Sequence, residues 1–158
     1  MAFSQLHLVR IGLALVILVS PLAVNASDEV PPEVQAADSV LARAGLPAIP
    51  GNATEVTCYS WSQTSAGVYA VFVLKPEEIA PYAEQFRGFS RAEPIPPSVL
   101  PAPLPDAPWF NPAGIAQGYV LWRTQVTISA PELVRLFVDT EAHRLFLYYT
   151  WNNRNVAY

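Results

Sequence analysis

Residues 93–112 read EPIPPSVLPAPLPDAPWFNP, and this stretch decides how the rest of the chain can fold. It contains eight prolines and no glycine. Because proline fixes the backbone angle φ and has no N–H to donate, neither a helix nor an interior strand can run through it. Polyproline II is the expected conformation, and at about 3.1 Å per residue the 19 residues from 94 to 112 can reach roughly 59 Å. A globular chain of this size is about 35 Å wide, so the stretch can cross the whole body.

Three interpretations of this stretch compete. A flexible linker would be rich in glycine and serine, which are nearly missing here. A recognition ligand would display prolines outward, as Pro94–Pro97 could. A strap fixed to one domain would bury large apolar side chains, and the stretch carries six: Ile95, Val99, Leu100, Leu104, Trp109 and Phe110. We favour the strap, because six such side chains are hard to explain in a solvated loop, and Trp109-Phe110 is its expected anchor.

Residues 1–26 have the pattern of a signal peptide. Arg10 precedes the apolar run IGLALVILV, and Val24-Asn25-Ala26 fits a cleavage site before Ser27. The apolar run is shorter than the roughly 20 residues that a membrane-spanning helix needs. The pattern predicts a periplasmic or secreted protein, with an uncleaved signal anchor as the alternative. Seven arginines against one lysine in the remainder are typical of a GC-rich bacterial genome.

Charge and cysteine content narrow the class of partner. Cleavage would leave 8 basic and 13 acidic side chains, a net charge of −5. This balance argues against nucleic acid and against anionic membrane surfaces as partners. Cys58 is the single cysteine, so the chain has no internal disulfide, and we interpret Cys58 as a small buried hydrophobic residue.

The part before residue 93 predicts helices and a hairpin. Residues 27–35 are acidic and contain prolines, which indicates a mobile lead-in to a single domain spanning 36–158. Hydrophobic spacing and turn residues predict a helix over 36–44, strands over 54–61 and 68–75, and a helix over 77–86. Gly67 is expected in the turn of the hairpin.

The part after residue 112 predicts an antiparallel meander. Strands are expected over 118–128, 133–140 and 144–152, because β-branched and aromatic residues are enriched there. For residues 129–138 a helix is the alternative, since Ser129 and Glu132 form a capping-box pattern. The predicted fold is α+β: an antiparallel sheet of about five strands, one or two helices on one face, and the long proline-rich strap at 93–112.

Few residues could carry catalysis. His143 is the single histidine outside the signal sequence, and Asp139, Glu141 and His143 alternate in a way that could converge on a metal. A polar hairpin turn is the simpler interpretation, since zinc sites usually recruit a second His or Cys. No nucleophile elbow or phosphate-binding glycine loop is present. We therefore predict no cofactor, no metal site and no enzymatic activity; a small metal-dependent or hydrolytic enzyme centred on His143 is the alternative.

Aromatic side chains on the predicted strands suggest a binding surface. On 144–152, Leu145, Leu147, Tyr149 and Trp151 share one face, and Phe146, Tyr148 and Thr150 share the other. The candidate binding residues are Trp109, Phe110, Tyr148 and Trp151. The sequence predicts a small exported binding protein, immunity-like or inhibitor-like, with an envelope or secreted protein as partner. A structural envelope component is the remaining alternative.

Overall fold

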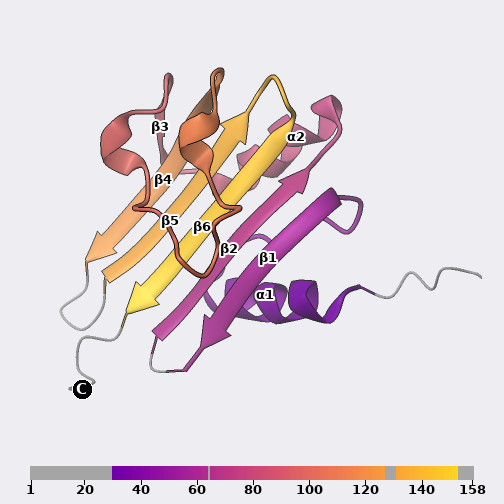
Figure 1. The fold of residues 1–158 in the computed structure, drawn as a ribbon, viewed down its shortest axis with the longest axis vertical. Coiled ribbons are helices and arrows are strands. Elements are labelled where there is room, and N and C mark those ends of the chain that lie inside the picture. The colour runs from indigo at the N-terminus through magenta and orange to yellow at the C-terminus, as the bar shows by residue number, and fades with distance from the viewer. Residues whose placement is uncertain (1–29, 64, 127–130, 153–158) are drawn as a thin grey trace, which may run out of the picture.

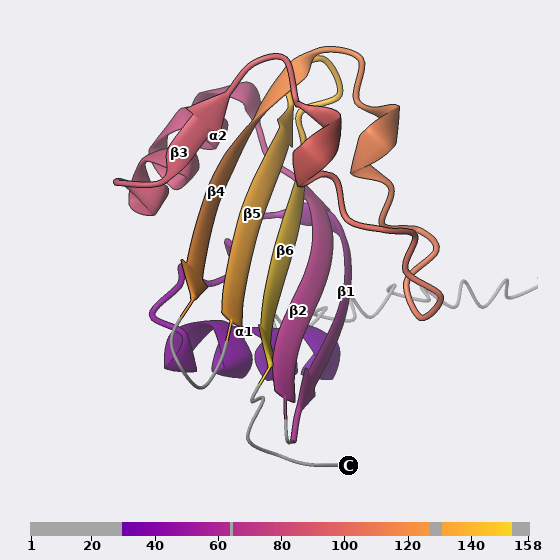
Figure 2. The same cartoon turned by 90° about the vertical axis from the view of Figure 1, so that its left-hand side faces the viewer.

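The computed structural model describes residues 30–63, 65–126 and 131–152, which form an α+β fold (Figure 1). Six antiparallel strands make one sheet in the order β1-β2-β6-β5-β4-β3. The strands are β1 (Thr54–Ser62), β2 (Ser65–Val73), β3 (Ser90–Ala92), β4 (Gly118–Val126), β5 (Pro131–Asp139) and β6 (Arg144–Asn152). The helices are α1 (Pro32–Arg43) and α2 (Pro76–Ala83), and both lie on one side of the sheet (Figure 2). The predicted mixed fold with an antiparallel sheet is confirmed, and the sheet has one strand more than expected.

Helix α1 begins four residues before its expected start. Pro32 occupies the first helical position, where its fixed φ suits the helix and its missing N–H costs nothing. Val34 and Ala37 are buried against the sheet. The segment from 32 to 35 is therefore helical rather than part of a lead-in. The predicted signal peptide lies outside the described residues.

The sequence leaves open whether residues 129–138 form a strand or a helix. The structure describes this segment from residue 131 onward and shows a strand, β5. Pro131–Asp139 is a strand, paired with β4 on one side and β6 on the other. Val134, Leu136 and Val138 are buried on the side of the helices, and Phe137 is buried on the opposite side. Burial on both faces suits a central strand and would not suit a helix on the surface. Ser129, the proposed cap of that helix, lies outside the described residues.

Each face of the sheet has its own hydrophobic cluster. The face that carries α1 and α2, called the helix face below, buries the larger cluster, which includes Leu41, Phe72, Ile79, Tyr82, Phe86, Leu136, Leu145 and Leu147. The opposite face, called the aromatic face below, buries a smaller cluster made of Ala107, Phe110, Val120, Phe137 and Phe146. Two members of the smaller cluster, Ala107 and Phe110, come from the proline-rich segment 93–112.

The proline-rich segment lies on the aromatic face, away from both helices (Figures 1 and 2). Ala107 is 0% exposed and Phe110 is 4% exposed. The ring of Phe110 meets that of Phe146 edge to face, with centroids 5.6 Å apart. The segment crosses β5 and β6 and reaches β2, but it does not extend over the Ser62 and Ser65 ends of β1 and β2 (Figure 1). Within residues 30–63, 65–126 and 131–152, this part of the aromatic face is therefore left without a covering layer.

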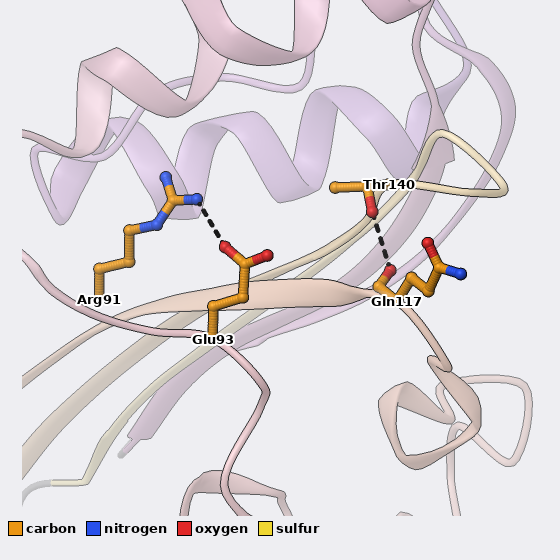
Figure 3. A network of polar contacts seen from close by, with 4 residues as sticks. All are labelled: Arg91, Glu93, Gln117 and Thr140. Atoms are coloured by element: carbon orange, nitrogen blue, oxygen red, sulfur yellow. Dashed lines mark hydrogen bonds and ion pairs between the residues drawn. The ribbon is translucent and has the colours of Figure 1, made fainter.

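Polar contacts hold the chain on either side of the proline-rich segment (Figure 3). Before it, the guanidinium of Arg91 on β3 pairs with the Glu93 carboxylate, with Nη2 and Oε2 3.1 Å apart. After it, the carbonyl oxygen of Gln117 accepts hydrogen bonds from the hydroxyl and the backbone N–H of Thr140, at 3.1 and 3.0 Å. The second contact ties the start of β4 to the turn between β5 and β6.

Candidate functional site

A row of aromatic side chains crosses the aromatic face. Pairing places Tyr59 of β1 opposite Tyr69 of β2, which lies opposite Tyr148 of β6. The row continues through Arg135 of β5 to Trp122 of β4. The Tyr59 and Tyr69 rings are stacked with centroids 6.3 Å apart, and the Tyr69 and Tyr148 rings with centroids 5.3 Å apart. Because directly paired residues on one face are close neighbours, the strand register alone assembles this row.

The guanidinium of Arg135 lies over the end of the tyrosine row. Its Cζ is 5.4 Å from the centre of the Tyr148 ring, within the range of a cation–π contact. This contact occupies the Tyr148 end of the row. The Tyr59 end, at the edge strand, has no such partner among the residues that the structure describes.

Trp61 forms a flat platform beside the Tyr59 end of the row. Its ring centroid is 5.0 Å from that of Tyr69 and 5.8 Å from that of Tyr59. Its indole Nε1–H donates a hydrogen bond of 3.1 Å to the Ser65 hydroxyl. The ring lies across Gly67, where a Cβ would overlap it. Gly67 was expected in the hairpin turn, but it lies within β2, and its lack of a side chain admits the indole ring.

A cavity of about 390 Å³ opens at this end of the aromatic face. It is lined by Tyr59, Trp61, Gln63, Ser65, Tyr69 and Asp106. Asp106 comes from a turn in the proline-rich segment, so the cavity joins the first hairpin to residues far away in sequence. Tyr59 is 41% exposed, which is unusual for a large aromatic side chain. The Asp106 carboxylate makes no ion pair or hydrogen bond with any other residue in the described part of the chain.

Tyr69 at the floor of this cavity stays protonated at ordinary pH. Burial raises the pKa of its phenol to about 12, and the neighbouring Tyr148, Asp106 and Tyr59 add to the increase. A neutral phenol can both donate and accept a hydrogen bond. The cavity therefore combines three aromatic rings, a neutral hydroxyl and a carboxylate.

The four candidate binding residues fall on different parts of the molecule. Trp109, Phe110 and Tyr148 all belong to the cluster on the aromatic face. Trp151 packs on the helix face instead, beside Tyr149 and Glu132. Residues 148 and 151 are an odd number of positions apart on one strand, so their side chains point to opposite faces. Phe110 is 4% exposed, which is too buried to meet a ligand, and its ring packs against that of Phe146.

Sequence reasoning missed the residues that line the cavity. Tyr59 and Trp61 stand two positions apart in TEVTCYSW, which is the spacing of neighbours on one face of a strand. That spacing could have identified the pair. Their meeting with Tyr69 depends on the register of β1 and β2, and their meeting with Asp106 depends on the path of the proline-rich segment. Neither can be read from local spacing.

The residues of the alternative metal site form a turn. The Asp139 carboxylate accepts hydrogen bonds from the backbone N–H groups of Glu141 and Ala142, at 3.1 and 2.9 Å. His143 has a φ of 53°, the left-handed conformation that ends this turn. No group of three or more His, Cys, Asp or Glu side chains that could hold a metal occurs within residues 30–63, 65–126 and 131–152. The Asp139 carboxylate thus stabilises the polar turn between β5 and β6.

Comparison with known protein families, with curated proteins and with solved structures finds no match to this chain. In the described ranges, no helix is both long enough and apolar enough to cross a membrane.

Proposed function

We propose that this chain is a small exported binding protein without enzymatic activity, and that it docks a protein partner on the uncovered part of the aromatic face. An immunity or inhibitor protein of the bacterial envelope is one instance of this class. The observation that carries the proposal is the aromatic row beside a cavity, in which Tyr59 is 41% exposed and Tyr69 and Trp61 are half-buried. The opposite face of the sheet is packed under two helices.

The chemistry of the uncovered surface suits a protein partner. Tyrosine and tryptophan dominate the residues that contribute most to protein binding, because they offer a large apolar area together with one polar atom. Trp61 is held in place by its hydrogen bond to Ser65 and by the space over Gly67. A side chain that is already ordered loses little entropy when a partner binds.

The proline-rich segment acts, in this proposal, as a strap rather than as a linker or a ligand. The burial of Ala107 and Phe110 against Phe137 and Phe146 supports this role. Proline restricts the unfolded chain, so less entropy is lost when the segment is ordered on the sheet. The strap would hold Asp106 at the edge of the cavity and so complete the binding surface.

A site-specific cross-link tests the docking surface. Tyr59→p-benzoylphenylalanine would be introduced into the full chain in a bacterial host that carries the surrounding genes, and irradiated in intact cells. Gln85→p-benzoylphenylalanine is the matched control, because Gln85 is exposed beyond α2, away from the aromatic face. We expect a discrete adduct from position 59, containing one identifiable envelope protein, and none from position 85. Equal labelling from both positions, or no adduct from 59 or from the neighbouring 61, would refute the docking surface.

Export is tested separately. We expect the periplasmic or secreted fraction to hold a protein that begins at Ser27, as intact mass would reveal. A protein retained in the cytoplasm at full length would contradict both cleavage and export.

A further inference from the structure

We propose that the cavity between Tyr59, Trp61, Tyr69 and Asp106 is a binding site for an organic cation, and that its occupant is an arginine or lysine side chain of the docked partner. This inference rests on the proposed function, because it names the part of the partner that enters the docking surface.

The three aromatic rings are arranged so that a cation can meet more than one of them. The ring centroids lie 5.0 to 6.3 Å apart. Tyr59 and Tyr69 are inclined by 25°, and Trp61 is inclined to Tyr69 by 58°. The face of an aromatic ring carries partial negative charge, so it attracts a cation placed within about 6 Å of its centre. A cation placed between the Trp61 ring and the two tyrosine rings would be attracted by the indole and by a phenol ring.

The charges around the cavity favour the same occupant. Asp106 carries the single formal charge among the six lining residues, and it is negative. Four carboxylates in the described part of the chain are paired with a guanidinium, in Arg87–Glu84, Arg91–Glu93, Arg123–Glu132 and Arg144–Glu55. Asp106 has no such partner there, so an incoming cation displaces no ion pair among the described residues. Burial is the main cause of the raised pKa of the Tyr69 phenol, and Asp106 adds to it; the same carboxylate would attract a cation.

The chain itself offers a comparison at the other end of the row. There the guanidinium of Arg135 already lies over Tyr148. Arg91 likewise lies over Tyr119, 3.7 Å from the ring centre, and Arg123 lies 4.8 Å from that of Phe89. Three aromatic rings on or beside this sheet are thus covered by guanidinium groups. The rings around the cavity lack such a cover among the described residues, and a partner's basic side chain would supply it.

Two probes that differ in charge but not in shape test the site. N-acetyl-L-arginine methylamide and N-acetyl-L-citrulline methylamide would be titrated into the purified exported protein. The readout is the NMR signal of the Trp61 indole N–H, assigned by its loss in Trp61→Phe. We expect the arginine probe to bind about tenfold more tightly, the combined effect of cation–π attraction and one carboxylate. Equal affinity for the two probes, or no shift of the Trp61 signal with either, would overturn the cation site.

Asp106→Asn isolates the contribution of the charge. Asparagine suits the turn as well as aspartate does, so the fold is retained. We expect the preference for arginine over citrulline to fall by about threefold or more, whereas Glu141→Gln in the distant β5–β6 turn leaves it unchanged. If both variants keep the full preference, Asp106 has no part in the site and the assignment fails.

The cross-link separates this inference from the proposed function. An adduct at position 59 that is equally strong in Asp106→Asn would retain the docking surface but overturn the cation as its recognised group. A clear arginine preference together with no protein adduct at 59 or 61 would retain the cation site and overturn the protein partner.

Discussion

The indole ring of Trp61 on β1 lies across Gly67 on β2, directly opposite it in the pairing of the two strands. The tryptophan covers the position where any other residue would carry its side chain. A glycine inside a strand weakens the strand, and here the neighbouring indole ring restores the lost packing. The same contact fixes the orientation of one wall of the candidate site.

Gly67→Ala is expected to displace Trp61. A Cβ at this position would overlap the indole ring, so the ring must leave its place or the strands must separate. Overpacking of this kind costs about 1–3 kcal/mol of the free energy of unfolding. Urea unfolding gives the cost, and loss of the Trp61–Ser65 hydrogen bond would shift the indole N–H signal. Gly51→Ala is the control, since a Cβ there meets nothing within 4 Å; equal effects of the two substitutions would contradict the close approach.

Phe110→Ala tests whether the proline-rich segment is a strap. The ring is buried against Phe146, so we expect a loss of about 3–5 kcal/mol in the free energy of unfolding. Pro105→Ala is the matched change at an exposed position of the same segment and should cost about 1 kcal/mol or less. Urea unfolding with both variants measures the difference. If Phe110→Ala costs no more than Pro105→Ala, the segment does not stabilise the domain.

The ion pair between Arg123 and Glu132 should contribute more than the others on the surface. Its Nη2 and Oε1 atoms are 2.7 Å apart, and the two side chains are 32% and 20% exposed. Removing one partner of a sheltered pair leaves the other charge without compensation. We expect Glu132→Ala to cost about 2 kcal/mol, and Glu84→Ala, in the exposed pair with Arg87, about 0.5 kcal/mol or less. Thermal unfolding of both variants would settle the order, and the reverse order would contradict the burial of Glu132.

Tyr69 should ionise later than an ordinary tyrosine. Its pKa is raised to about 12 in the folded protein, from the usual value of 10, chiefly by burial. The folded state therefore holds this proton more tightly than the unfolded chain does, so stability is unaffected below pH 10 and declines as pH rises from 10 towards 12. Absorbance of tyrosinate at 295 nm during a pH titration follows the ionisation. Tyr69→Phe should remove an ionisation step near pH 12 from this titration. If the titration curve of the variant is unchanged, Tyr69 does not ionise near pH 12.

Cys58 should be a slow nucleophile. Burial raises the pKa of its thiol, and Glu33 and Asp38 add to the effect, so little reactive thiolate forms near neutral pH. We expect alkylation by iodoacetamide at pH 8 to be several-fold slower in the folded protein than after denaturation in urea. Mass spectrometry over time measures both rates. Equal rates would indicate an accessible thiol and would contradict the partial burial of Cys58.

The sequence by itself determined part of the secondary structure of this protein. Strand β6 lies at 144–152 as predicted, because alternating large apolar and aromatic residues have few other stable arrangements in so short a run. Pro76 begins α2, and Ile79, Tyr82 and Phe86 are buried on one side of it and of the turn that follows, as their helical spacing predicts. These outcomes depend on interactions within a few residues, which the sequence records directly.

The tertiary structure alone decided which aromatic residues meet. The register between β1, β2 and β6 places Tyr59, Tyr69 and Tyr148 in one row, and no residue in any of the three strands specifies it locally. Trp151 lies on the helix face, as the alternation along β6 requires, so it does not share a surface with Tyr148. Asp106 reaches the first hairpin because Phe110 fits the cluster around Phe146 across the sheet. Contacts between residues distant in sequence arise from the packing of whole faces, so the binding surface emerges only once the sheet has formed.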